Sequence, residues 1–369
     1  MKKLLWVMAL LSIWLVPEIA LAYPIPPQPL RKLCQESDLI IVATVVSVTT
    51  TTDREGFGIA KAVLYPTTVL KGSLGQGAVE VLYSPDIICP APPHYAEGEQ
   101  VLAFLYSSKE EAGYYTAGLS WGAKNLPWPA IQSYADRVRE LLEIERLDPT
   151  LQQAQLLEWL VRCTENPATR WEGAYELARD PQFLHYDEKI PPPNFASMLS
   201  AEQKNRLANA LYGSLEIGPG EMSLIDLLER WENPYLMGFI FNHLKAIKDD
   251  PSSYEIGHLM TLVARAAGSE AGLKLAERFR DVYFMREENR GLQDRRAILA
   301  EFIAALEHNP QVAKLLSPPS QPKPKAEHQA TVSTPKSLTQ KKSSSGFSLF
   351  AAALAVAAAF ASARAFFVR

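Results

Sequence analysis

Apolar runs rich in β-branched residues alternate with turn-forming residues in the first third of the chain, and this pattern predicts β-strands. The densest run, Leu-Ile-Ile-Val-Ala-Thr-Val-Val-Ser-Val after Asp38, is typical of a largely buried strand. The predicted strands are residues 39–49, 59–70, 78–83, 100–106 and 114–117. Five strands in so short a segment favour a small closed barrel of the OB type over a sandwich. Pro66 must lie at an edge or a bulge, because it has no N–H to donate.

The period of the apolar residues becomes helical at Ile131, so we expect a barrel domain over residues 23–129 and a helical domain over residues 130–316. Asx-Pro pairs in the helical domain can start helices, because Asp or Asn caps the helix and Pro needs no N–H there. The pairs lie at Asp148, Asn166, Asp180, Asn233, Asp250 and Asn309. Ser200 and Gln203 form a predicted capping box. The pattern predicts a multidomain α+β chain whose second domain is a solenoid-like array or an irregular bundle.

The N-terminus has the three parts of a secretory signal peptide: Lys2 and Lys3, an apolar run, and a small-residue Ala-Leu-Ala sequence. We therefore expect residues 1–22 to be removed by cleavage between Ala22 and Tyr23. An uncleaved N-terminal anchor is the alternative. Pro17 argues against it, because the apolar run ends there, short of a membrane span.

The C-terminal part changes composition twice. Residues 317–346 are rich in Pro, Lys, Ser and Thr, and they predict a disordered stalk because they cannot bury enough apolar surface to fold. Residues 347–368 are Ala-rich and apolar and predict a transmembrane helix, with Arg364 able to snorkel. The arginines place the C-terminus in the cytoplasm and the folded part in the periplasm or the extracellular space. The alternatives are a helix docked on the helical domain and a processed sorting signal.

Composition and charge narrow the classes of function. The 369 residues are 47% hydrophobic and 21% charged, as in ordinary globular proteins, and a net charge of −4 argues against nucleic acid as a partner. Three cysteines in an exported chain suggest one disulfide and one leftover thiol. Cys163 falls on the apolar stripe of its predicted helix, so we expect a buried thiol there, with an intermolecular disulfide as the alternative.

Three segments resemble, in their order and spacing, the netrin-like superfamily that includes the tissue inhibitors of metalloproteinases. They are Asp-Leu-Ile-Ile-Val-Ala-Thr-Val downstream of Cys34, Val-Leu-Lys-Gly at residues 69–72, and Cys89 with Gly-Glu-Gln-Val-Leu-Ala-Phe-Leu at residues 98–105. The resemblance covers roughly residues 34–121 and implies an OB-type barrel with a disulfide from Cys34 to Cys89. On the loop-entropy model such a bond would stabilise the domain by about 3 to 5 kcal/mol. The segment around Trp159 and Trp171 looks like a HEAT-type helix pair.

The resemblance does not carry the inhibitory mechanism with it. In the animal inhibitors, a cysteine at the mature N-terminus binds the protease zinc through its free amine and its carbonyl. Here the predicted mature N-terminus is Tyr23, so Cys34 has no free amine to offer. We therefore expect a plain binding or structural module, with a protease inhibitor or a protease-regulating factor as the alternative.

Gly118 to Gly122 match the Gly-x-Ser-x-Gly pattern of hydrolase nucleophile elbows, with Ser120 as the nucleophile. That elbow requires a helix after the serine, and the Lys-Asn-Leu-Pro-Trp-Pro that follows predicts no helix start. We expect a turn at the end of the barrel, with a Ser120-dependent hydrolase as an alternative.

The six histidines show no His-Glu-x-x-His spacing and no nearby Cys pair, and the chain has no Gly-rich phosphate loop. We therefore expect no catalytic, metal-binding or cofactor-binding residues. His94 and Tyr95, in the loop after Cys89, form a candidate interaction loop. The prediction is a membrane-anchored, exported, non-enzymatic protein of the cell envelope that binds another protein, with a protease among the candidate partners.

Overall fold

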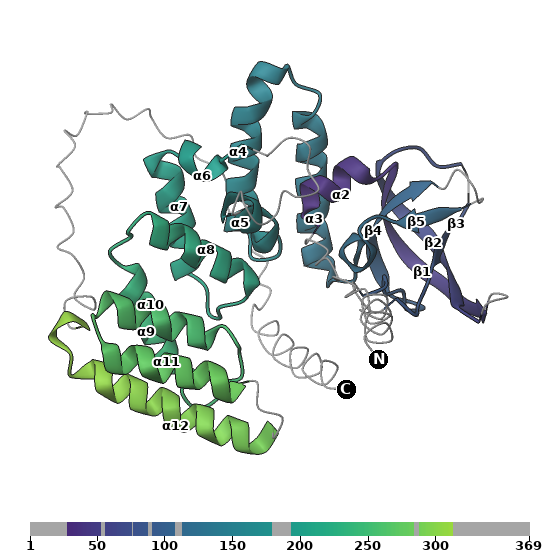
Figure 1. Cartoon of the computed structure of the whole chain (residues 1–369). Helices are drawn as coiled ribbons and strands as arrows, with labels where there is room; N and C mark the ends of the chain where they lie inside the picture. The colour runs from purple at the N-terminus through teal and green to yellow at the C-terminus, as the bar shows by residue number, and fades with distance from the viewer. Residues whose placement is uncertain are drawn as a thin grey trace, which may run out of the picture. The chain divides into compact units, whose positions relative to one another are not determined.

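The computed structural model describes residues 28–52, 56–75, 77–87, 91–107, 113–178, 193–283 and 288–312 (Figure 1). The predicted signal peptide, stalk and transmembrane helix lie outside these residues, and so does Cys89. None of the helices within them is both long and apolar enough to cross a membrane. The described stretches form a small β-barrel followed by a helical region.

Five strands close into a mixed β-barrel, which confirms the predicted strands. They are β1 (Leu39–Thr52), β2 (Gly58–Lys71), β3 (Val79–Tyr83), β4 (Gln100–Ser107) and β5 (Tyr114–Thr116). Their order is β1-β2-β3-β5-β4, and β1 pairs with β4 to close the barrel. β3 and β5 are parallel, whereas the other neighbours are antiparallel. The short β6 (Ala123–Lys124) also pairs with β4.

β1 is buried on both faces over its first half, which explains its almost unbroken apolar sequence. The side chains that face the barrel interior are those of Leu39, Ile41, Ala43 and Val45. Ile40 and Val42 alternate with them and belong to a second core, which the barrel shares with the helices and which also contains Phe104 of β4. The barrel therefore contributes one face of β1 and β4 to the packing of the helical region.

Pro66 lies beside a bulge of β2, as predicted. Val42 pairs with Thr68 and Ala43 pairs with Pro66, so Thr67 is the extra residue between the two pairs. The Thr67 hydroxyl donates a hydrogen bond to the carbonyl oxygen of Val42 at 3.0 Å. The bulge accommodates a proline within a long strand, where it would otherwise remove a ladder hydrogen bond.

A helix that the sequence pattern does not predict, α2 (Leu30–Glu36), precedes the barrel and buries Leu30, Leu33 and Cys34 in the shared core. Cys34 and Cys163 are free thiols, and burial raises the pKa of both. The expected bond from Cys34 to Cys89 is not formed at Cys34, which is a free thiol buried in the core, and Cys89 itself lies outside the described residues. The expected buried thiol at Cys163 is confirmed.

The predicted helical region is confirmed. Its helices are α3 (Trp128–Ile144), α4 (Pro149–Glu165), α5 (Arg170–Ala178), α6 (Phe195–Met198), α7 (Ala201–Tyr212), α8 (Pro219–Arg230), α9 (Leu236–Ala246), α10 (Ile256–Ala266), α11 (Glu270–Tyr283) and α12 (Glu288–Glu307). The closest packing joins α4 to α5, α5 to α8, α10 to α11, and α11 to α12. Figure 1 shows α9 to α12 lying beside one another.

Local capping explains where several helices start. Asp148 caps α4, because its carboxylate accepts the N–H of Thr150 at 2.9 Å. Ser200 and Gln203 form the predicted capping box of α7. Asn166 and Asn233 accept the N–H two residues further on in the same way, but α5 and α9 begin only several residues later. These Asx-Pro pairs form turns that lead into helices rather than the helix starts themselves.

One expectation about helix starts is wrong. The segment after Ser120 predicts no helix start, yet α3 begins at Trp128 with Pro129 in its first turn. Proline is tolerated there because the first N–H groups of a helix have no partner within the helix. The barrel therefore passes into the helical region over the few residues between β6 and α3.

A buried ionic network joins the barrel to the helices. Glu172 on α5 is 1% exposed, and its carboxylate accepts hydrogen bonds from the Leu30 N–H at 2.7 Å, Lys124 Nζ at 2.8 Å and the Tyr134 hydroxyl at 2.9 Å. These donors belong to α2, β6 and α3. Beside them, Arg31 of α2 pairs with Glu176 of α5 at 2.7 Å. One carboxylate thus connects the start of α2, the end of the barrel and two helices.

Candidate functional site

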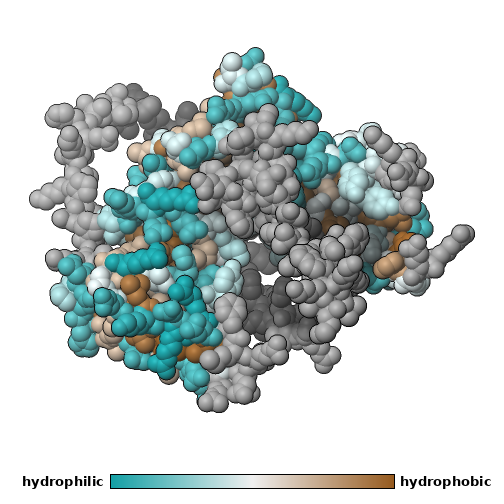
Figure 2. Space-filling view, in the orientation of Figure 1, coloured by the Kyte–Doolittle hydropathy of each residue, from teal (hydrophilic) through white to brown (hydrophobic). Residues whose placement is uncertain are grey.

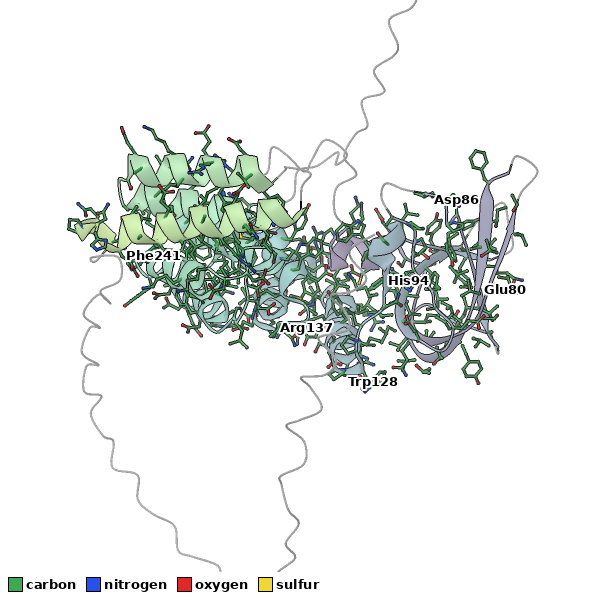
Figure 3. All side chains as sticks on the ribbon, turned by 90° about the horizontal axis from the view of Figure 1, so that it is seen from below. Glu80, Asp86, His94, Trp128, Arg137 and Phe241 are labelled. Carbon is green, nitrogen blue, oxygen red and sulfur yellow. The ribbon has the colours of Figure 1, made fainter. Side chains whose placement is uncertain are left out.

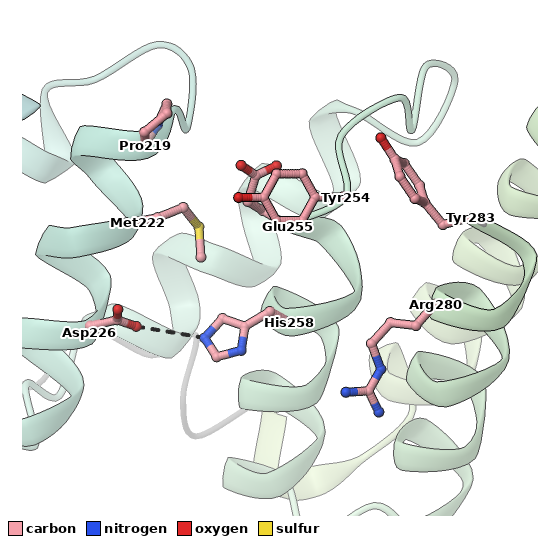
Figure 4. A pocket seen from close by; sticks show the side chains of 8 residues that line it. All are labelled: Pro219, Met222, Asp226, Tyr254, Glu255, His258, Arg280 and Tyr283. Atoms are coloured by element: carbon pink, nitrogen blue, oxygen red, sulfur yellow. Dashed lines mark ion pairs between the residues drawn. The ribbon is translucent and has the colours of Figure 1, made fainter. Parts of the chain in front are cut away.

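A pocket of about 480 Å³ lies among three helices of the array (Figure 4). Its lining residues come from the first two turns of α8, the start of α10 and the last turn of α11. They are Pro219, Met222, Asp226, Tyr254, Glu255, His258, Arg280 and Tyr283. The pocket combines apolar and aromatic walls with four ionisable groups that can carry charge, a combination typical of sites that bind ligands or peptide side chains.

A histidine–aspartate contact connects two of the helices across the pocket, and it is an ion pair when His258 is protonated. His258 Nε2 of α10 lies 3.7 Å from Asp226 Oδ1 of α8, as the dashed line in Figure 4 shows. The two side chains are 47% and 45% exposed. A pair so accessible to water contributes at most about 1 kcal/mol to stability. Its effect on the pocket is to give the Asp226 carboxylate a partner.

Glu255 and Tyr254 form the rim at the start of α10. The Ser253 hydroxyl donates a hydrogen bond to the Glu255 carboxylate. Partial burial, together with the charge of Glu255 and a hydrogen bond to it, raises the pKa of the Tyr254 phenol, so the hydroxyl stays protonated. The Tyr254 side chain is nevertheless 64% exposed. An aromatic ring held at a pocket rim and open to solvent is available to a partner.

Tyr283 closes the opposite side of the pocket. Its ring lies edge-on to that of Tyr254 with 6.4 Å between the ring centroids. The Arg295 guanidinium stands 5.1 Å from the centre of the Tyr283 ring, and Arg295 Nε also donates to the carbonyl oxygen of Pro251. α12 therefore supports the pocket wall from behind, through a cation–π contact.

Arg280 is the basic group of the α11 wall, and Figure 4 shows its guanidinium extending toward the side of the pocket where His258 lies. Within the described stretches of the chain, it makes no ion pair. Its aliphatic stem packs on Gly257 of α10: a Cβ at Gly257 would lie 2.4 Å from Arg280 Cγ. The absence of a side chain at Gly257 is what lets Arg280 take this position.

The face of the array that is seen in Figure 2 is mostly polar. Figure 2 shows hydrophilic residues over most of the visible face of α9 to α12, with small, separate hydrophobic patches. The apolar residues of these helices, such as Phe241 and Phe279, are in the core instead. A partner on this face would therefore meet mixed polar and apolar groups rather than one broad apolar patch.

The candidate interaction loop presents only one of its two side chains. Tyr95 is 5% exposed and packs in the barrel interior, where its hydroxyl bonds to Thr116 Oγ1 at 2.7 Å. His94 is exposed, and its carbonyl oxygen accepts a hydrogen bond from Asn125 at 2.7 Å (Figure 3). Tyr95 is therefore a core residue that fixes the loop, and only His94 is accessible to a partner.

Ser120 does not lie in the geometry of a nucleophile elbow. It belongs to a single 3-10 turn, η1 (Leu119–Gly122), which leads into β6 rather than into a helix. The residues with a positive φ here are Gly118, at 64°, and Leu119, at 54°, and not the serine. The Ser120 N–H donates to the carbonyl oxygen of Ala91, and no described histidine bonds to its hydroxyl. The turn predicted at the end of the barrel is what the structure has here.

The residues that line the pocket were not distinguished in the sequence. His258 has no partner at helical spacing, because Asp226 comes from another helix. The residues described contain no cluster of three or more His, Cys, Asp or Glu that could hold a metal. The one local signal is Gly257 within an otherwise regular helix, since an isolated helical glycine often marks close packing. Neither a protein-family model nor a curated protein matches the chain.

Proposed function

We propose that this chain is an exported, membrane-anchored protein of the cell envelope that binds another protein and has no catalytic activity. The observation that carries the proposal is the pocket of α8, α10 and α11, which is lined both by an exposed Tyr254 ring and by Arg280, an arginine with no ion pair among the described residues. Tyr and Arg are the residue types that most often dominate binding energy at protein interfaces. The signal peptide, stalk and C-terminal apolar segment of the sequence support export and anchoring.

In this proposal the barrel is an OB-type module related to the netrin-like domains. Its strand order β1-β2-β3-β5-β4, with parallel β3 and β5, supports that relationship. The barrel would act as a structural module, because the Glu172 network and the shared core tie it to the helices. Its accessible residues, His94 among them, offer a second surface for a partner.

The alternative of a protease inhibitor is less well supported. The cysteine mechanism requires an accessible cysteine amine and carbonyl. Here Cys34 lies inside α2 with no exposed surface, and its carbonyl oxygen accepts a hydrogen bond from Lys71 Nζ at 2.7 Å. The Ser120 hydrolase alternative also loses support, because the turn around Ser120 leads into a strand.

Tyr254→Ala should reduce capture of the partner by the pocket. The experiment is a crosslinking pull-down from intact cells, with the anchored full-length chain as bait. If Tyr254 is a binding hot spot, its truncation costs at least about 2 kcal/mol, which is roughly a thirtyfold loss of affinity. The matched control is Tyr65→Ala on β2, because Tyr65 is 59% exposed and lies outside the pocket.

The proposal requires that the wild type and the Tyr65→Ala variant capture the same protein, and that the Tyr254→Ala variant captures much less of it. Equal recovery with Tyr254→Ala would remove the pocket as the binding site. Selective loss with Tyr65→Ala would place the partner on the barrel instead.

A further inference from the structure

We propose that the pocket of α8, α10 and α11 recognises a carboxylate side chain, Asp or Glu, next to an apolar residue in a peptide segment of the partner. This inference rests on the proposed protein-binding function and adds the chemistry of the bound segment. Arg280 receives the carboxylate, and Tyr254 with Met222 covers the apolar neighbour.

The charged side chains of the pocket differ in whether they already have a hydrogen-bond or ion-pair partner. Asp226 is paired with His258, and Glu255 accepts hydrogen bonds from Ser253 and Tyr254. Arg280 makes neither an ion pair nor a hydrogen bond within the stretches that the structure describes. The guanidinium is therefore the charged group of the lining that still has its full hydrogen-bonding capacity.

The position of Arg280 is fixed more closely than that of an ordinary surface arginine. Its Cγ and Cδ pack against Gly257, where an added Cβ would approach them to 2.4 and 3.2 Å. The stem is thus held on α10 and the guanidinium is directed into the pocket (Figure 4). A guanidinium presents a planar fork of donors that matches the two oxygens of a carboxylate, and holding it in place reduces the entropy lost on binding.

The rest of the lining fits the residue next to the carboxylate. Met222 is a flexible apolar side chain that adapts to different shapes, and Tyr254 supplies an exposed flat ring. A lysine or arginine ligand is a poorer fit, because Glu255 already accepts a hydrogen bond from Ser253 and a cation at Asp226 would meet the neighbouring His258. A phosphate group is also a poorer fit, since its recognition typically uses a cluster of arginines.

The test is a selection of random heptapeptides displayed on phage against the immobilised full-length chain. With the wild type we expect enrichment of Asp or Glu beside an aromatic or aliphatic residue. With Arg280→Glu the acidic preference should disappear, and a selected acidic peptide should bind at least about tenfold more weakly. Arg278→Glu is the matched control, because Arg278 lies on the same helix, is 63% exposed, pairs with Glu301 and does not line the pocket. It should select the same peptides as the wild type.

Gly257→Ala is a second variant, which keeps the charge of Arg280 but displaces its stem. It should weaken binding of the selected acidic peptide by a factor similar to that of Arg280→Glu, without creating a preference for basic peptides. Two outcomes would overturn the inference and leave the protein-binding function intact. The selected peptides could depend on Tyr254 but show no acidic preference, or the acidic preference could survive Arg280→Glu. If no selected peptide binds the Tyr254→Ala variant more weakly than the wild type, the pocket is not a peptide site and this inference is overturned, whereas the protein-binding function is decided by the pull-down.

Discussion

Glu172→Ala should lower the free energy of unfolding by about 3 to 5 kcal/mol, the cost of removing one partner of a buried ion pair. The Glu172 carboxylate is 1% exposed, and it accepts hydrogen bonds from Lys124 Nζ, the Tyr134 hydroxyl and the Leu30 N–H. Alanine would leave the Lys124 ammonium, itself 12% exposed, without this partner, and would leave two further buried donors unsatisfied. Urea unfolding of the full-length chain, followed by circular dichroism, measures the loss.

Two variants show whether burial is the cause. Glu172→Gln keeps the size and part of the hydrogen bonding but removes the charge, so we expect it to lose less stability than Glu172→Ala. Glu143→Ala removes the partner of Arg146 in a pair whose side chains are 71% and 72% exposed, and it should cost less than about 1 kcal/mol. If Glu172→Ala is no more destabilising than Glu143→Ala, the network does not hold the barrel on the helices.

The strands could be predicted because their signal is local. Each is a short run of β-branched and apolar residues between turn residues. Pro66 predicted an edge or a bulge, and the bulge is found beside it. The first half of β1 is the clearest case, since burial on both faces leaves Thr44 as the only polar residue in the run. The ends of the strands are less well defined by the sequence. β1 continues past its predicted end at residue 49 to Thr52, because threonine favours strands, although these residues are exposed.

α2 could not be predicted, because what stabilises it is distant in the sequence. The helix is only 7 residues long, and no side chain caps its start after Pro29. Its first N–H is satisfied by Glu172 of α5, and its buried face packs in the shared core. An isolated helix of this length is unstable in water, so only tertiary contacts can form it. The same helix determines where the Cys34 side chain lies, which the cysteine count alone could not indicate.

The pocket was missed for a similar reason. Asp226, Tyr254 and Arg280 lie on or next to three different helices, and no pair of them has a helical spacing. Helix starts and apolar stripes indicate that helices exist, but not which of their polar residues meet. The close contact of Gly257 with Arg280 between α10 and α11 is a feature that is visible only once the helices are packed.

A chain that ends at Gly346 should lose membrane association completely and appear in the soluble exported fraction. The residues removed begin with an Ala-rich apolar run, 347–363, that is just long enough to span a bilayer when Arg364 snorkels. The predicted signal peptide upstream and the arginines beyond the run both predict that the C-terminus stays in the cytoplasm and the folded part outside. Fractionation of cells followed by a high-salt wash of the membranes measures the effect.

Point variants separate an anchoring helix from a general effect of truncation. Leu354→Arg with Val356→Arg places charge at the centre of the predicted span, at a cost of about 2.5 to 3.5 kcal/mol per residue on insertion scales, and should release the full-length chain. Leu338→Arg adds one arginine within the predicted stalk and should leave the protein in the membrane fraction. Truncated protein that still sediments with washed membranes would show that the attachment lies elsewhere in the chain, because a polar stalk alone provides no apolar surface to hold it there.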